Sequence, residues 1–476
     1  MGSKPSAQRQ IIVPYPSENG QNCPGENTDY TVYTDSGNRE DSSFGDPLLV
    51  TAIDFGTTYS GSVFCFKGYK NRILAGTQGF YQDDERIPTV ILLNPDQTFN
   101  SFGYEAQDTY SKLKEEKAQY FYFEHFKMAL YKNMESSSNT TTLMDIRGRR
   151  VKAKDIFVML IKNLLHLAMD IVKGLQTRDI AWIVTIPASW SESSRKLVQD
   201  SVLSVGIEDK NLHFVLEPHA AAVYCMNVDT SSTSSPMSRP PKELHSELAD
   251  TAEETGITVG DKCIILDIGG GSTDIWVYEV EGQNELKEMH KATEEIGGNS
   301  VNSEFIELMK GLVGEPVWSD FQEDYTGSYY TLMRDFDRKK RSFSNDVDSV
   351  TMSLENELLH VLKETTGDTL SDVITMIGAD DKIKFKSHLN KVTLDKETME
   401  ELFEKSVDAI VQLIEKTLRV CQKWSVHTMF MVGGFSESPY LREIIRSKFS
   451  EIRVVFPDDA KLVVLRGAVI LGYQSQ

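Results

Sequence analysis

Two segments of the chain share one pattern, an apolar run that ends in Asp-x-Gly and is followed at once by a second apolar run. The first contains Asp54-Phe-Gly-Thr-Thr58 and the second contains Asp267-Ile-Gly-Gly-Gly271, so the two aspartates lie 213 positions apart. An aliphatic run that stops at Asp and Gly is typical of a buried strand entering a tight turn. The pattern therefore predicts one β-hairpin in each half of the chain.

Each hairpin is followed far downstream by a helix-like segment of small residues, which is Glu217–Val223 in the first half and Leu465–Ile470 in the second. A chain of 476 residues is too long for a single hydrophobic core, so two or more core units are expected. Repetition on this scale predicts two similar α/β lobes that face each other across a cleft. Further helices are expected at 153–173, 190–206, 328–345, 394–424 and 438–449.

Low-complexity segments set the expected limits of the two lobes. Residues 1–47 are rich in Ser, Gly, Asn and Pro and have few aliphatic side chains, so this tail is predicted to be disordered. Residues 227–260 hold a Ser-rich and then an acidic stretch, which predicts a solvated insertion loop. The first lobe is therefore expected at 48–226 and the second at 261–476.

Charge and cysteine content exclude several classes of partner. The net charge of −21 argues against nucleic acid and against anionic membrane surfaces, because both need clustered Lys and Arg. There is no apolar signal segment at the N-terminus, and no apolar run is long enough to span a bilayer. The five cysteines include no C-x-x-C pair, which argues against zinc and suits a reducing compartment. We expect a cytoplasmic protein.

The two hairpins are candidates for a phosphate-binding site. A strand that ends in Gly-Thr-Thr directs several backbone N–H groups at one point, and such a concavity binds anions. Gly56 allows the backbone to approach phosphate closely, and Thr57 and Thr58 add hydroxyl donors. An aspartate beside phosphate requires a Mg²⁺ between them, usually through water. Either hairpin alone could be an ordinary polar turn; the two together favour a clamp for a Mg²⁺-polyphosphate, with the metal between Asp54 and Asp267.

The order of these segments resembles the ATPase domain of the 70-kDa heat-shock protein family, within the actin and sugar-kinase superfamily. The resemblance covers roughly residues 48–474 and rests on five motifs in the family's order: Ile53–Ser60, Val184–Ala188, Leu216–Ala222, Leu266–Asp274 and Met431–Gly434. The divergence, the Ser-rich insertion and the acidic character look most like the branch that holds heat shock 70 kDa proteins 12A and 12B. The resemblance implies an actin-like fold with ATP or ADP and Mg²⁺ in the cleft.

Matching positions also imply roles. Asp54 and Asp267 would lie near Mg²⁺, and Lys127 would stabilise charge on the transferred phosphoryl group, although it could instead be a solvated helix lysine. Glu217 and Asp274 would order water, so the catalytic set is Lys127, Glu217, Asp267 and Asp274. Residues implied at the phosphates are Gly56, Thr57, Thr58, Tyr59, Gly269, Gly270, Gly271 and Ser272.

A second set is implied around the nucleoside. Lys340, Arg341 and Ser344 resemble the family's adenosine helix, in which residues at i and i+4 share a face; the alternative is a basic solvated face. The rest of the implied pocket is Gly298, Gly433, Gly434 and Asp458. This chain departs from the family at three positions: Glu437 replaces an arginine that packs on adenine, and Asn299 and Asn302 replace acids.

Three functions are compatible with these residues. A slow ATPase would open and close its lobes with the nucleotide state. A non-hydrolysing nucleotide-dependent switch or adaptor would recruit protein partners through the tail, the 227–260 loop or the lobe surfaces. A small-molecule kinase of the same superfamily would need an acceptor pocket. Because the chain stops at Gln476, no peptide-binding β-sandwich is expected within it.

Overall fold

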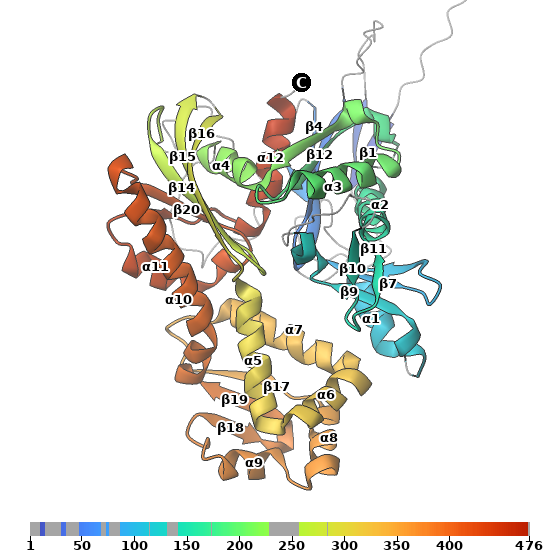
Figure 1. The fold of residues 1–476 in the computed structure, drawn as a ribbon, viewed down its shortest axis with the longest axis vertical. Coiled ribbons are helices and arrows are strands. Elements are labelled where there is room, and N and C mark those ends of the chain that lie inside the picture. The colour runs from blue at the N-terminus through green and yellow to red at the C-terminus, as the bar shows by residue number, and fades with distance from the viewer. Residues whose placement is uncertain are drawn as a thin grey trace, which may run out of the picture.

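The computed structural model describes residues 10–14, 30–34, 47–67, 73–75, 86–113, 115–130, 141–172, 174–227, 257–282 and 284–474. Two mixed sheets, one from each half of the chain, stand side by side, and each carries a smaller outer part below it in Figure 1. The expected α/β fold with two related lobes is confirmed.

The first sheet has the strand order β13-β12-β3-β4-β5, and β6 also pairs with β4. The strands β3 and β4 form the predicted hairpin, and β12 and β13 run parallel to β3. The bounds are β3 Leu49–Phe55, β4 Tyr59–Phe66, β5 Leu74–Ala75, β6 Ile87–Pro88, β12 Ile180–Ile186 and β13 Leu212–Leu216.

The second sheet repeats this plan in the order β16-β15-β14-β20-β21. Here β14 and β15 form the hairpin, and β20 and β21 run parallel to β14. The bounds are β14 Lys262–Ile268, β15 Thr273–Gly282, β16 Glu285–Glu294, β20 Thr428–Val432 and β21 Arg453–Val455. The repeat seen in the sequence is therefore a duplication of the sheet.

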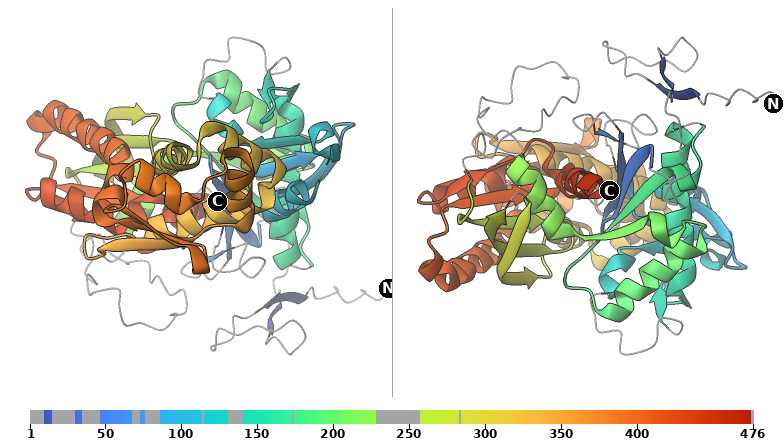
Figure 2. Two further views of the ribbon diagram at one scale, coloured as in Figure 1. Left: turned by 90° about the horizontal axis from the view of Figure 1, so that it is seen from below. Right: turned by 90° about the horizontal axis from the view of Figure 1, so that it is seen from above.

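The helices repeat as well. α3 (Glu192–Ser204) and α4 (Glu217–Asn227) follow β12 and β13, just as α11 (Pro439–Lys448) and α12 (Val463–Gln474) follow β20 and β21. The small-residue helices α4 and α12 pack against each other between the two sheets (Figures 1 and 2). Although α12 lies in the second half of the chain, its buried side chains join one core with Val50 and Ile183 of the first sheet.

The helix α2 (Ala153–Ile171) covers the other face of the first sheet. Its residues Lys162, His166 and Asp170 form an exposed stripe, as their i, i+4, i+8 spacing predicts, while Ile156 and Leu160 are buried. Predicted helices 190–206, 394–424 and 438–449 are confirmed as α3, α10 (Lys396–Cys421) and α11.

Each lobe also carries an outer part, in which the sequence patterns located only the helix expected at 328–345, seen as α7 (Thr326–Ser342). In the first lobe it consists of β7 Val90–Leu93, β8 Phe99–Phe102, β9 Phe121–Glu124, β10 Thr142–Met144, β11 Arg150–Lys152, α1 Gly103–Lys112 and the short turns η1 Glu115–Gln119 and η2 Phe126–Leu130. In the second lobe it consists of α5 Gly298–Val313, α6 Glu315–Asp324, α7 Thr326–Ser342, α8 Asn356–Thr366, α9 Leu370–Met376, β17 Ser349–Ser353, β18 Ile383–Lys386 and β19 Lys391–Asp395.

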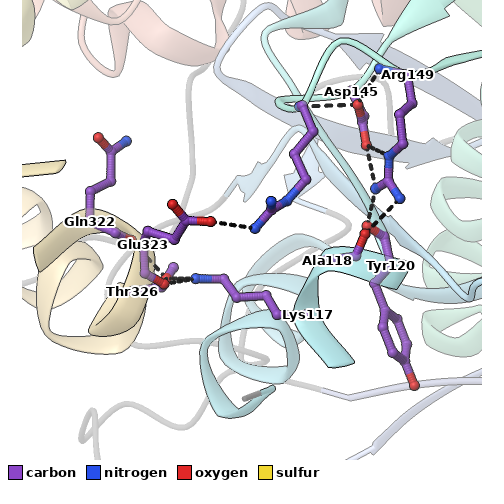
Figure 3. A network of polar contacts seen from close by, with 9 residues as sticks. Lys117, Ala118, Tyr120, Asp145, Arg149, Gln322, Glu323 and Thr326 are labelled. Carbon is purple, nitrogen blue, oxygen red and sulfur yellow. Dashed lines mark hydrogen bonds and ion pairs between the residues drawn. The ribbon is translucent and has the colours of Figure 1, made fainter. Parts of the chain in front are cut away.

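The two outer parts touch at their far end, and Figure 3 shows the polar residues involved. Lys117 of η1, only 7% exposed, donates hydrogen bonds to the carbonyl of Glu323 and the hydroxyl of Thr326. Arg147 forms an ion pair of 3.0 Å with the Glu323 carboxylate. We call Lys117, Arg147, Glu323 and Thr326 the outer lobe contact. It closes the cleft on the side away from α4 and α12.

Parts of the expected tail and loop fall outside the described residues. Within 1–46 only β1 (Gln10–Pro14) and β2 (Tyr30–Thr34) are described, and they pair antiparallel. The segment 228–256 is likewise outside the described residues, so disorder of the tail and loop stays a prediction. Among the residues that the structure describes, no helix has the length and apolar character needed to cross a bilayer.

Candidate functional site

The two hairpins face each other across the cleft. Their turns are alike, because the Gly56 amide donates to the Tyr59 carbonyl at 3.1 Å and the Gly269 amide donates to the Ser272 carbonyl at 2.9 Å. The hairpins also touch: a Cβ added at Gly270 would lie 2.2 Å from the Thr58 hydroxyl oxygen. The predicted opposition of two glycine-rich turns, one from each lobe, is therefore present.

Acidic side chains form the floor between the hairpins. Asp54 ends β3 and accepts a hydrogen bond of 2.8 Å from the Thr185 hydroxyl of β12. Asp267 occupies the equivalent position at the end of β14. Asp274 accepts hydrogen bonds from the hydroxyls of Ser272, at 3.0 Å, and Thr293, at 2.7 Å.

Lys127 reaches this floor from η2 of the first outer part. Its side chain is 4% exposed, and its ammonium is 2.8 Å from the Glu217 carboxylate, which begins α4. The ammonium also lies 5.5 Å from the ring centre of Phe55 and 5.7 Å from that of Trp190. The alternative of a solvated helix lysine is therefore wrong, because Lys127 is buried and paired with a second predicted site residue.

The pKa shifts show an excess of negative charge at this point. Burial, and then the charges of Asp274, Glu217 and Asp54, raise the pKa of Asp267 to about 8. Burial raises the pKa of Glu217 to about 7, although Lys127 acts in the opposite direction. Burial disfavours the charged form of Lys127, but Glu217, Asp54 and Asp267 outweigh it and raise the lysine pKa. The buried ammonium of Lys127 is thus the one positive charge that these pKa shifts show among four carboxylates, which are Asp54, Glu217, Asp267 and Asp274.

This donor set fits a divalent cation. Mg²⁺ is usually held in proteins by one or two carboxylates together with water and substrate phosphates, rather than by a complete protein cage. In the described part of the chain, no group of three or more His, Cys, Asp or Glu side chains forms a ready-made metal cage. Asp54 and Asp267 are the carboxylates that could hold the ion.

The turn after β20 closes the site from the second lobe. Gly433 has a φ of +88°, and a Cβ there would lie 2.3 Å from the Asp267 carboxylate. Glycine is therefore required at 433 both for its backbone conformation and for its closeness to Asp267. Gly434 follows and lines the same pocket.

On the nucleoside side, Lys340 and Arg341 line the pocket from the end of α7. The ammonium of Lys340 donates to the Gly298 carbonyl at 3.0 Å and to Asn302 at 2.8 Å, and it pairs with Asp337 at 2.8 Å. Arg341 pairs with the same Asp337 at 2.8 Å and stands 5.3 Å from the centre of the Tyr59 ring.

Two predicted contacts are not part of this pocket. The helix expected at 328–345 ends at Ser342, because Phe343 turns into an extended conformation and is buried. Ser344 therefore lies beyond the helix and does not share a face with Lys340, so that geometric prediction is wrong. Asp458 is exposed and does not line the pocket; its backbone carbonyl is 3.5 Å from Arg466.

Every other predicted residue lines one pocket of the structure, and their chemical roles stay predictions. The pocket also contains residues that sequence reasoning did not assign to the site: Arg86, Asn299, Asp337, Ala460, Lys461, Phe435 and Val464. Asn299 had a signal, as a departure from the family pattern, and Asp337 and Phe435 adjoin predicted residues on the same helix or turn. Arg86, Ala460, Lys461 and Val464 stand on segments that reach the pocket only when the chain folds.

The pocket and its neighbour differ greatly in size. The pocket between the hairpins has a cavity of about 140 Å³, whereas an adjoining cavity between the outer parts measures about 1320 Å³. Thr57, Thr58, Tyr59, Gly271, Asn299, Asp337 and Arg341 line both. The two cavities therefore share the glycine-rich turns and the end of α7.

Comparison with known proteins agrees with this geometry. The family model described as Hsp70 protein matches residues 50–473. Heat shock 70 kDa protein 12A of Homo sapiens is 27% identical, over 92% of this chain and 71% of its own length. Heat shock 70 kDa protein 12B of Homo sapiens is 27% identical, over 89% and 68%. Chaperone protein dnaK1 of Prochlorococcus marinus is 21% identical, over 88% and 55%.

Proposed function

The chain belongs to the Hsp70 protein family, in the branch of heat shock 70 kDa proteins 12A and 12B, and from this premise we propose that it binds ATP with Mg²⁺ and hydrolyses it slowly. Binding of a nucleotide is the part of this function that the family supports in general. Hydrolysis, and lobe movement coupled to it, are the proposal.

One observation carries the proposal: the buried Lys127–Glu217 pair of 2.8 Å at the point where the two acidic hairpins converge. A phosphoryl group held by both turns would lie beside a fixed ammonium. Positioning and electrostatic stabilisation supply most of the catalysis in phosphoryl transfer, so such an ammonium is well placed to stabilise negative charge in the transition state.

The four carboxylates of the site have different roles in this proposal. Glu217, whose pKa of about 7 allows it to exchange a proton near neutral pH, would orient and deprotonate the attacking water. Asp274 is held by two hydroxyl donors, Ser272 and Thr293, so its carboxylate is fixed in direction and can order a second water. When bound between Asp54 and Asp267, Mg²⁺ would neutralise phosphate charge.

Lobe movement follows from where the turns are placed. Thr57 and Thr58 belong to the first lobe, and Gly270 and Gly271 belong to the second. A polyphosphate that accepts hydrogen bonds from both turns favours the closed arrangement of the lobes, and loss of the γ-phosphate removes part of that preference.

Single-turnover hydrolysis with Mg-ATP tests the proposal. The wild type should release γ-phosphate. Asp54→Asn should release it at a rate lower by about 100-fold or more, because it loses a predicted metal carboxylate. Asp320→Asn, at an exposed position on α6, is the matched control and should behave as the wild type. If the wild type releases no phosphate and Asp54→Asn is indistinguishable from it, the hydrolysis proposal fails. Nucleotide-dependent thermal stabilisation without turnover would then favour the non-hydrolysing switch.

The large cavity favours one other function. A small-molecule kinase needs an acceptor site beside the terminal phosphate, and the cavity of about 1320 Å³ shares Thr57, Thr58 and Gly271 with the hairpin pocket. Its wall includes Glu124 and His125, which could serve as a base. ATP consumption that depends on an added sugar or acid would support this function, and consumption that is independent of any acceptor would exclude it.

A further inference from the structure

Arg86 lines the hairpin pocket from the first lobe. The centre of its guanidinium lies 5.3 Å from the centre of the Tyr59 ring. Its terminal nitrogen would be 2.9 Å from a Cβ built at Gly434, so the guanidinium lies against the glycine turn of the second lobe. The side chain therefore crosses the cleft between the two lobes. No motif in the sequence marks it.

The backbone that carries Arg86 is fixed to the first phosphate hairpin. The following strand β6 pairs with β4, with Ile87 opposite Ser60 and Pro88 opposite Tyr59. The Thr89 amide donates to the Thr58 carbonyl at 2.9 Å, and the Thr89 hydroxyl donates to the Gly56 carbonyl at 2.8 Å. The backbone of Arg86 is thus held beside the turn that would hold phosphate.

The glycine turn that Arg86 touches is also next to the metal-binding floor. Gly433, one residue before Gly434, is packed directly against the Asp267 carboxylate. The guanidinium therefore contacts the turn whose preceding residue packs against the carboxylate that would hold Mg²⁺. At position 437, where the family has an arginine, the Glu437 carboxylate instead accepts a hydrogen bond of 3.2 Å from the Lys461 amide.

Arg86 shares its pocket with the first phosphate turn. Thr57, Thr58 and Tyr59 line the same pocket as Arg86. A guanidinium can form charge-assisted hydrogen bonds to phosphate, which are among the stronger polar contacts in proteins.

We propose that Arg86 is a nucleotide-positioning residue, whose guanidinium, beside Tyr59 and Gly434, donates hydrogen bonds to phosphate oxygens of a bound nucleoside di- or triphosphate. The contact comes from the first lobe, opposite the Gly433–Gly434 turn, so it adds to the forces that hold the two lobes together around the ligand. This inference rests on the proposed nucleotide binding.

The test compares ADP with adenosine by calorimetric titration of the wild type, Arg86→Ala, Arg86→Lys and Arg338→Ala, all in the presence of Mg²⁺. Arg86→Ala should weaken ADP binding about tenfold or more, because it loses charge-assisted hydrogen bonds, and should change adenosine binding by less than about threefold. Arg86→Lys should restore part of the ADP affinity, since a lysine offers a point charge without the guanidinium fork. Arg338, which is exposed and lines only the outer cavities, controls for loss of one positive charge near the cleft.

The outcomes separate the two proposals. If the wild type binds neither ligand, the proposed nucleotide binding fails and this inference fails with it. If the wild type binds ADP and Arg86→Ala binds it equally well, only the role of Arg86 is overturned. An equal loss of ADP and adenosine affinity would also overturn it, because the effect would then not involve phosphate. Unchanged thermal unfolding of Arg86→Ala without ligand would confirm that the variant is folded.

Discussion

Buried lysines show how far the role of one residue type depends on its neighbours. Lys127 has one carboxylate partner and faces the pocket floor, so its charge remains directed at a ligand. Lys340 has three acceptors, the Gly298 carbonyl, Asn302 and Asp337, which match the three N–H donors of an ammonium. Burial lowers the pKa of Lys340, and Asp337 opposes this. We infer that Lys340 mainly joins α7 to the start of α5.

The contribution of Asp267 to the free energy of unfolding should depend on pH. Its pKa of about 8 lies above the ordinary value of 3.8, so folding disfavours the charged carboxylate; this cost grows as the pH rises from about 4 and is complete above about 8. Asp267→Asn should therefore raise the free energy of unfolding of the metal-free protein by about 1–3 kcal/mol near pH 9 and by less near pH 5. Urea unfolding at both pH values measures this.

The same variant should lose stabilisation by ligand. Mg-ADP should raise the melting temperature of the wild type more than that of Asp267→Asn, because the variant lacks one predicted metal carboxylate. Asp320→Asn, exposed on α6, controls for the substitution itself. A variant that is less stable than the wild type near pH 9 would contradict the electrostatic explanation.

At the scale of elements, the contact between α4 and α12 is unusually close. A Cβ at Gly467 of α12 would lie 1.8 Å from the Ala220 carbonyl oxygen of α4. The Cβ would be attached to the backbone of α12, and the carbonyl oxygen belongs to the backbone of α4. Because both helices are buried, the two atoms can separate only if a whole helix shifts. The small residues of the two repeated segments are what allow the helices to meet between the sheets.

Gly467→Ala should consequently destabilise the protein, although alanine is the better helix former. We expect a loss of about 1–3 kcal/mol or more in the free energy of unfolding, as for other overpacked cores. Gly311→Ala is the matched control, because Gly311 lies within α5 and a Cβ there would meet nothing within 4 Å. The free energy of unfolding of Gly311→Ala should rise by up to about 1 kcal/mol, because alanine is the better helix former. Equal effects of the two substitutions in chemical denaturation would show that helix propensity, not packing, decides.

At the scale of the whole molecule, the contacts between the lobes include two separated places outside the hairpin pocket. One is the packing of α4 against α12, and the other is the outer lobe contact of Figure 3. Within the outer lobe contact, burial lowers the pKa of Lys117, with Arg147 acting in the same direction and Glu323 opposing both. Arg149 fixes the first-lobe side, since it pairs with Asp145 at 2.6 Å and donates to the Ala118 carbonyl at 2.9 Å.

Removal of Lys117 should loosen the closed arrangement. Lys117→Ala leaves the Glu323 carbonyl and the Thr326 hydroxyl without this buried donor, so we expect release of bound ADP to become about tenfold faster. Arg147→Ala removes the neighbouring, more exposed ion pair with Glu323 together with a contact to Tyr110, and should change the rate by less than about threefold. Stopped-flow displacement of a fluorescent ADP analogue measures both rates. If the two variants release ADP at the wild-type rate, the outer lobe contact does not limit release.

Much of the site could be predicted from the sequence because its residues lie in short contiguous turns. Residues 54–59 form one turn and residues 267–272 form the other. The residues within each turn lie close together because they are neighbours in the sequence. Arg86 could not be predicted in this way, since it precedes β6, which reaches the pocket by pairing with β4. Ser344 was misplaced because the helix ends where buried Phe343 must turn inward.

The sequence by itself determined the family, the duplicated α/β plan and the opposed glycine-rich turns, because these depend on local strand and turn preferences that recur in both halves. Only the tertiary structure decided that Lys127 pairs with Glu217, that Lys340 is occupied within the protein, and that Arg86 crosses the cleft. These three facts concern side chains from distant segments. Their partners and charges are set by burial, which exists only once both lobes have folded against each other.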